Sequence, residues 1–225
     1  MISGFANIFN WVVNWFDWFL SPPLCFNCKD FLNVRQVFCK SCLSLITSTT
    51  SLEFTIKRYR IKVYAVGAYK EPLKYLVLAK LRGNTSASAQ LGYLCAKKLN
   101  TLEKLEKIDY IIPVPLHWIR YVQRGYNQVR IMSDEISKHL KIPVFDYIKR
   151  NNNTKYQSAL TKEQRKVNVR SAFFIPKKIG ELLENKSLLI VDDLYTTGST
   201  VQEIAKILVK YKPSHITVIV GARGN

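Results

Sequence analysis

The chain has 225 residues, 48% of them hydrophobic, which suffices for one buried core with a small accessory module and excludes a disordered tail. Its formal net charge is +18, from 34 basic and 16 acidic residues. Such a charge favours polyanions, namely nucleic acid, anionic membrane or phosphorylated metabolites, although a solvated lysine-rich surface explains it equally well. The sequence contains no run of about 20 apolar residues, which argues against a membrane-spanning helix.

The first segment, residues 1–22, is rich in aromatic side chains and ends at Pro22-Pro23. It has no basic start and no small-residue cleavage site, so it does not resemble a signal peptide. Its spacing predicts an amphipathic helix, whose aromatic face packs on the protein body or lies on a membrane surface. We expect the chain in the cytoplasm, or at the inner face of the membrane.

Residues 23–50 contain four of the five cysteines, arranged as two pairs that are each spaced by two residues: Cys25 and Cys28, then Cys39 and Cys42. Two such pairs complete a tetrahedral four-thiolate site. The segment is too small to bury a core of its own, so its folding should depend on metal. We therefore predict a structural zinc ribbon with one Zn²⁺. A redox function would require a thioredoxin-like βαβ context, which the sequence lacks.

Residues 51–225 alternate strand and helix patterns. The predicted strands are 61–69, 109–115, 171–175, 187–191 and 215–220, and the predicted helices are 71–83, 86–99, 128–140 and 201–211. Nearly continuous apolar strands that alternate with helices indicate the α/β class, with a parallel sheet flanked by helices.

The run from Leu188 to Thr200 carries the most specific chemistry. Its strand is predicted to end at Val191, and open α/β sheets bind ligands beyond that edge. Asp192 and Asp193 then supply paired carboxylates, which suit the hydroxyl groups of a ribose. The following turn leads into a helix, where a glycine, hydroxyl groups and N–H groups can hold a phosphate. An Asp-Asp turn that merely caps a helix is the alternative.

This run resembles the signature with which type I phosphoribosyltransferases bind 5-phosphoribosyl 1-pyrophosphate (PRPP). The resemblance implies that Asp192 and Asp193 bind the ribose 2- and 3-hydroxyls. It assigns the 5-phosphate to Tyr195, Thr196, Thr197, Gly198, Ser199 and Thr200. With the cysteine pairs and the segments 113–128 and 154–173, the chain is similar to the ComF family of competence proteins, over about residues 20–223.

By the same resemblance, the loop 115–125 would hold the pyrophosphate and Mg²⁺, with Leu116, His117, Arg120, Arg124 and Gly125 as candidates. Arginines are suitable charge-assisted partners for phosphate, although ordinary surface charge also explains them, and His117 could instead cap the loop. The 154–173 segment corresponds to the flexible loop that closes over PRPP. Its candidates are Gln157, Lys162 and Arg165, for which packing on a helix surface is the alternative.

The resemblance further implies a role in natural transformation, in which DNA enters as a single strand. Basic residues between positions 57 and 82 are interleaved with tyrosines, a mixture that can follow a nucleic-acid backbone and stack on bases. The DNA-binding candidates are Lys57, Arg58, Arg60, Lys74, Lys80 and Arg82. The alternative places these tyrosines in the core of the sheet.

Three functional hypotheses remain open. The first is a DNA-handling competence protein that needs its PRPP site. The second is an active phosphoribosyltransferase with an unknown acceptor, for which the sequence shows neither a pocket nor a catalytic residue. The third is an adaptor whose zinc ribbon recruits a DNA-uptake helicase or a recombination mediator. A phosphoribosyltransferase fold binds its ligand in each case, since a fold by itself does not determine turnover.

Overall fold

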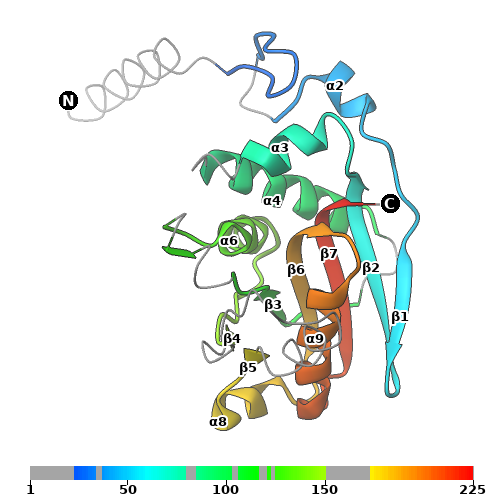
Figure 1. Cartoon of the computed structure of the whole chain (residues 1–225), viewed down its shortest axis with the longest axis vertical. Helices are drawn as coiled ribbons and strands as arrows, with labels where there is room; N and C mark the ends of the chain where they lie inside the picture. The colour runs from blue at the N-terminus through cyan, green and yellow to red at the C-terminus, as the bar shows by residue number, and fades with distance from the viewer. Residues whose placement is uncertain are drawn as a thin grey trace, which may run out of the picture. The chain divides into compact units, whose positions relative to one another are not determined.

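The computed structural model describes residues 23–33, 37–79, 85–102, 106–116, 121–122, 125–150 and 173–224 (Figure 1). The chain divides into two compact units, one ending at Leu45 and the next beginning at Ile46. The helix predicted over 1–22 lies outside the described residues. Within them, no helix has the length and apolar character needed to cross a membrane.

The first unit is built around the cysteine pairs. Leu24 and Phe31 form an isolated antiparallel bridge on either side of the first pair. Helix α2 (Lys40–Ser44) begins directly after Cys39, whose sulfur accepts a hydrogen bond from the backbone N–H of Cys42.

The second unit contains a five-stranded sheet of order β1-β2-β7-β6-β3. Its strands are β1 (Leu52–Ile56), β2 (Tyr59–Ala68), β3 (Tyr110–Pro113), β6 (Ser187–Tyr195) and β7 (His215–Arg223). The pairs β2–β7, β7–β6 and β6–β3 are parallel, as predicted. The edge strand β1 is antiparallel to β2 and was not predicted, because its short alternating pattern remains largely exposed.

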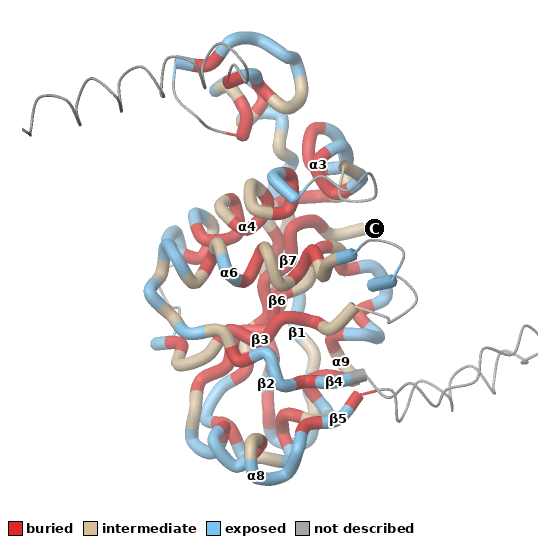
Figure 2. The backbone as a smooth tube through the Cα atoms, turned by 90° about the vertical axis from the view of Figure 1, so that its left-hand side faces the viewer, coloured by how far each residue is buried: buried red, intermediate tan, exposed pale blue. Residues whose placement is uncertain are grey.

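Helices flank this sheet. They are α3 (Leu73–Ala79), α4 (Thr85–Asn100), α6 (Gln128–Leu140) and α9 (Ser199–Leu208), with short helical turns α8 (Lys177–Gly180), η2 (Glu181–Leu183) and η3 (Val209–Tyr211). Helices α4 and α6 pack against each other on one face, and α9 lies over the opposite face (Figure 1). The middle strands are therefore buried on both sides (Figure 2).

Two of the predicted strands differ from the structure, one in its pairing and one in where it ends. The strand expected over 171–175 is described only as β5 (Phe173–Phe174), which pairs with β4 (Lys149–Arg150) in a separate antiparallel ladder rather than in the main sheet. A short apolar run does not reveal its pairing partner. The strand expected to end at Val191 continues to Tyr195, because β7 provides a hydrogen-bonded neighbour along that whole length.

Close packing of α4 on α6 depends on Gly92. A β-carbon at this position would lie 2.6 Å from the carbonyl oxygen of Met132 and 2.9 Å from its Cα, both in the backbone of α6. Since backbone atoms cannot rotate away, any side chain here must push the two helices apart.

We predict that Gly92→Ala destabilises the protein by up to about 2 kcal/mol. Helix propensity alone favours alanine by about 1 kcal/mol, but overpacking a tight contact costs about 1–3 kcal/mol. Urea unfolding followed by circular dichroism measures the difference. Ser86→Ala, at an exposed position of the same helix, is the control and should change stability by less than about 0.5 kcal/mol. A more stable Gly92→Ala protein would contradict the tight packing.

Candidate functional site

The carboxyl ends of the parallel strands meet at one edge of the sheet. Beyond the strands, the pairing continues through backbone hydrogen bonds. Val114 N–H donates to Val191 at 3.0 Å, and Gly224 N–H donates to Tyr195 at 2.8 Å. The end of β3, the motif at the end of β6 and the chain after β7 are therefore held together, at the edge where open α/β sheets bind ligands.

Asp192 and Asp193 lie within β6 and not beyond it. Because consecutive residues of a strand point to opposite faces, their side chains leave the sheet on different sides. Asp192 is half-buried, and its Oδ1 accepts a hydrogen bond from the backbone N–H of Asp193 at 2.8 Å. Asp193 is 7% exposed and lies on the face that α4 and α6 cover. The two carboxylates are thus in different environments.

The buried carboxylate of Asp193 has a partner that sequence analysis gave no role. Gln128, the first residue of α6 and 5% exposed, donates from Nε2 to Asp193 Oδ2 at 2.9 Å. Gln128 belongs to the 113–128 segment of the family resemblance, but its partner lies 65 residues away. A glutamine at a helix start carries no signal that would identify such a contact.

The turn after β6 presents hydroxyl groups at the start of α9. Thr196, Thr197, Ser199 and Thr200 are exposed, and the hydroxyls of Thr197 and Ser199 are 2.8 Å apart. The first N–H groups of a helix have no partners within it and attract anions. The predicted phosphate-binding residues therefore lie together, at the start of a helix of ten residues.

Gly198 makes this turn possible. It precedes α9 with a φ of 72°, in the left-handed region that side chains disfavour. A β-carbon there would also overlap the ring and hydroxyl of Tyr195. The left-handed conformation and the close approach of Tyr195 both require glycine at this position. The Tyr195 ring is buried beside the turn.

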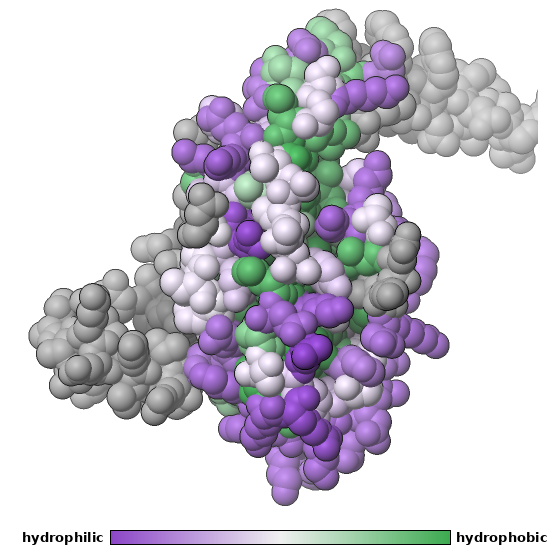
Figure 3. Space-filling model, turned by 90° about the vertical axis from the view of Figure 1, so that its right-hand side faces the viewer, coloured by the Kyte–Doolittle hydropathy of each residue, from purple (hydrophilic) through white to green (hydrophobic). Residues whose placement is uncertain are grey.

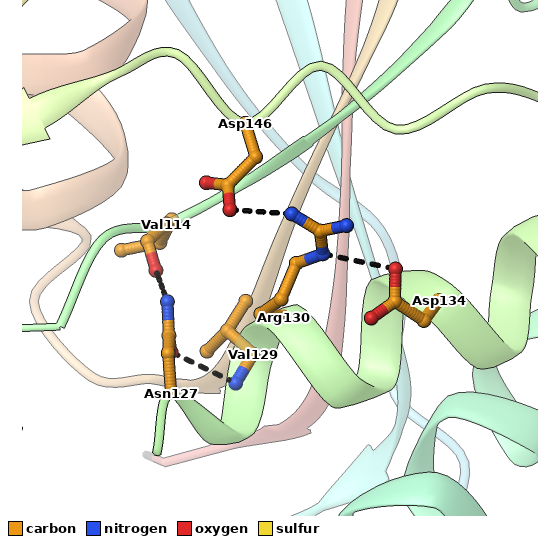
Figure 4. Close-up of polar contacts among 6 residues, drawn as sticks. All are labelled: Val114, Asn127, Val129, Arg130, Asp134 and Asp146. Atoms are coloured by element: carbon orange, nitrogen blue, oxygen red, sulfur yellow. Dashed lines mark hydrogen bonds and ion pairs between the residues drawn. The ribbon is translucent and has the colours of Figure 1, made fainter. Parts of the chain in front are cut away.

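The loop before α6 is described only in part. Leu116 is half-buried and Gly125 is exposed with a φ of 75°. Asn127 closes the loop, since its Oδ1 accepts from Val129 N–H at 3.1 Å and its Nδ2 donates to the Val114 carbonyl at 3.3 Å (Figure 4). The other pyrophosphate candidates His117, Arg120 and Arg124 lie outside the described residues, as do the flexible-loop candidates Gln157, Lys162 and Arg165.

In the first turn of α6, Arg130 connects the helix to the chain that follows it. Its guanidinium pairs with Asp134 at 2.9 Å and with Asp146 at 2.6 Å (Figure 4). These two hydrogen-bonded carboxylates raise the pKa of Arg130 despite partial desolvation. The contact holds α6, which carries Gln128, in place.

The basic candidates fall into two groups. Lys57, Arg58 and Arg60 lie at the β1–β2 hairpin, whereas Lys74 lies on α3, beyond the other end of β2 (Figure 1). Ten residues of β2 span about 30 Å, so the two groups do not form one cluster. The remaining candidates, Lys80 and Arg82, lie outside the described residues.

The hairpin itself combines cations and an aromatic ring. The guanidinium of Arg58 lies 5.4 Å from the centre of the Tyr59 ring, and Arg60 pairs with Glu53 at 3.0 Å. Tyr59 is buried and Tyr64 is half-buried, while Tyr75 on α3 is exposed. The face toward β1 and β2 is most hydrophilic at its lower end (Figure 3). The tyrosines therefore serve partly as core, which was the alternative considered from sequence.

The four cysteines of the first unit form one cluster. Their sulfurs all lie within 4.8 Å of one another, and those of Cys28 and Cys39 are 3.7 Å apart. Sulfurs around a tetrahedral zinc ion with Zn–S bonds of about 2.3 Å are about 3.8 Å apart. The cluster is therefore able to hold such a metal, as the cysteine spacing predicted.

The surroundings of these sulfurs suit metal binding. Burial alone would raise the pKa of Cys25, but backbone N–H groups, including that of Cys39 at 3.4 Å, point at its sulfur and lower its pKa to about 6. The N–H of Asp30 lowers the pKa of Cys28, but the Asp30 carboxylate accepts from the thiol at 3.1 Å and raises it above its ordinary value. Metal binding requires the cysteines to be deprotonated, which the N–H groups around Cys25 favour and the Asp30 carboxylate beside Cys28 opposes.

Known proteins are similar to this chain in sequence. A model of the phosphoribosyl transferase domain matches residues 129–225. Competence protein F of Haemophilus influenzae is 32% identical over 203 residues, which cover 88% of this chain and 83% of that protein. The chain is a member of the ComF family. The domain match confirms the predicted α/β fold of phosphoribosyltransferase type. The structure confirms the four-cysteine cluster on its N-terminal side.

Two further proteins are similar to this chain. DNA utilization protein YhgH of Shigella flexneri is 32% identical over 154 residues, 66% of each chain. Competence protein ComFC of Streptococcus pneumoniae is 23% identical over 197 residues, 82% of this chain and 80% of that protein.

We predict that Cys39→Ser abolishes stoichiometric metal binding, because it leaves three thiolates at a site that needs four. The ribbon should then become sensitive to protease. Metal content by mass spectrometry and limited proteolysis measure both effects. Ser41→Ala, at an exposed position of α2, is the control and should keep its metal. Unchanged metal content in Cys39→Ser would contradict the four-cysteine site.

Proposed function

We propose that this ComF-family chain binds PRPP together with Mg²⁺ and serves natural competence in the cytoplasm by handling single-stranded DNA. The run 188–200 carries the proposal, because its carboxylates and its phosphate-binding turn lie at the carboxyl edge of the sheet, at the start of α9. The match to the phosphoribosyl transferase domain supports PRPP as the ligand. The names of the relatives, competence protein F and DNA utilization protein, support a role with DNA.

In this proposal, each part of the ligand has its own group of residues. The hydroxyls and N–H groups from Thr196 to Thr200 hold the 5-phosphate. Asp192 and Asp193 accept hydrogen bonds from the ribose hydroxyls. The loop 115–125 holds the pyrophosphate and Mg²⁺, with its arginines as charge-assisted donors. Zn²⁺ at the cysteine cluster has a separate, structural role, since four thiolates leave no position open for chemistry.

The proposal covers binding, and turnover is a separate question. Transfer of the phosphoribosyl group would release pyrophosphate and would require an acceptor. The adaptor hypothesis, in which the ribbon recruits a helicase or a recombination mediator, differs in that it needs no DNA affinity from this chain. The measurements below separate these alternatives.

We predict that Asp192→Asn and Asp193→Asn each weaken PRPP binding by about 10- to 100-fold, since a hydrogen bond to a charged group contributes about 1.5–3 kcal/mol. Calorimetric titration of PRPP with Mg²⁺ measures this. Glu181→Gln, at an exposed position of η2, controls for loss of one negative charge and should bind normally. Absence of binding by the unaltered protein would sink the PRPP proposal. Pyrophosphate release on addition of candidate acceptors would identify an enzyme.

We predict that Lys57→Ala with Arg58→Ala weakens binding of single-stranded DNA. The slope of log affinity against log salt should fall by about 0.7 for each phosphate that the protein no longer neutralises. Fluorescence anisotropy with a labelled oligonucleotide at several salt concentrations measures both quantities. Lys138→Ala with Lys206→Ala removes the same charge where each lysine is paired with a glutamate, and should keep the slope. No DNA affinity of the unaltered protein at physiological salt would favour the adaptor hypothesis.

A further inference from the structure

The buried contact between Gln128 and Asp193 stands out because it joins the start of α6 to the middle of the candidate site. The amide donor and the carboxylate oxygen are 2.9 Å apart, and both side chains are more than nine-tenths buried. A carboxylate in such a place is costly unless it is hydrogen-bonded. Gln128 supplies such a bond, and an amide orients a carboxylate without neutralising its charge.

The backbone on either side of this contact is closely packed. Gly221 lies beside Asp193 in β7, and a β-carbon there would be 2.9 Å from the Asp193 carbonyl. Leu91 of α4 occupies the space that a side chain at Gly221 would fill. At the other end of the contact, Asn127 caps α6 and so sets the position of the next residue, Gln128.

We propose that Gln128 is a positioning residue of the PRPP site, whose amide orients the Asp193 carboxylate toward the ribose hydroxyls. This inference rests on the proposed function. A carboxylate is planar, so a bond to Oδ2 also restricts the direction of the second oxygen. Without the amide, the Asp193 side chain has more freedom to rotate about its χ angles, and binding the ribose would have to restrict that rotation.

The expected consequence is specific to the ribose. Gln128→Met keeps a side chain of similar length but removes the donor. It should weaken PRPP binding by about two- to tenfold, the size expected when binding has to immobilise one more side chain. Binding of Mg²⁺-pyrophosphate, which has no ribose hydroxyls, should change by less than about twofold. The ratio of the two affinities separates orientation of Asp193 from general loss of structure.

A double-mutant cycle provides the second test. If Gln128 acts through Asp193, Gln128→Met should have almost no effect in a protein that already carries Asp193→Ala, so the two changes will not add. Lys138→Ala, at an exposed position near the far end of the same helix, is the matched control and should leave PRPP affinity unchanged. Thermal unfolding of every variant verifies that it is folded at the assay temperature, and Gln128→Ala replaces Gln128→Met if the latter is not.

The outcomes are distinguishable. Equal losses of PRPP and pyrophosphate affinity, or additive effects in the cycle, would show that Gln128 is merely structural and overturn the inference while the PRPP proposal stands. If the unaltered protein binds Mg²⁺-pyrophosphate too weakly to measure, the double-mutant cycle alone tests the inference. Failure of the unaltered protein to bind PRPP overturns both proposals.

Discussion

The arrangement of this protein depends on strand β6, which is hydrogen-bonded to β3 on one side and to β7 on the other and is covered by helices on both faces. Its residues Leu188 to Val191 are almost completely buried. Burying four such side chains contributes about 6–12 kcal/mol as an upper estimate. That contribution offsets the cost of burying one carboxylate, which is roughly several kcal/mol even after its surroundings relax. The strand can therefore carry Asp193 into the interior.

Because β6 continues through Asp192 and Asp193, the pleat of the strand determines which face of the sheet each side chain points to. Asp192 and Asp193 point to opposite faces and have different partners. Only after Tyr195 does the chain leave the sheet, and it does so through a glycine conformation that sets the start of α9. The candidate ligand site is thus a strand end with two dissimilar carboxylates, followed by a turn with several hydroxyl groups.

The basic residues of the β1–β2 hairpin lie away from this edge. The β1–β2 hairpin, with its cations, lies at the amino end of β2, so polyanion binding there would not compete with a ligand at the carboxyl edge. The cysteine cluster belongs to a separate compact unit, whose small size makes metal the natural source of its stability.

Several features were determined by the sequence itself: the cysteine pairs, helix 128–140, and the apolar run that ends in Asp192 and Asp193 all rest on local spacing, and the structure agrees with each. Tertiary structure decided the features that need a distant partner. The edge strand β1, the separate β4–β5 ladder, the extension of β6 to Tyr195 and the bond from Gln128 to Asp193 arise from pairing between distant segments. The types and spacing of residues indicate whether a segment forms a helix or a strand. A hydrogen bond between residues 65 positions apart depends instead on how the helices and strands pack.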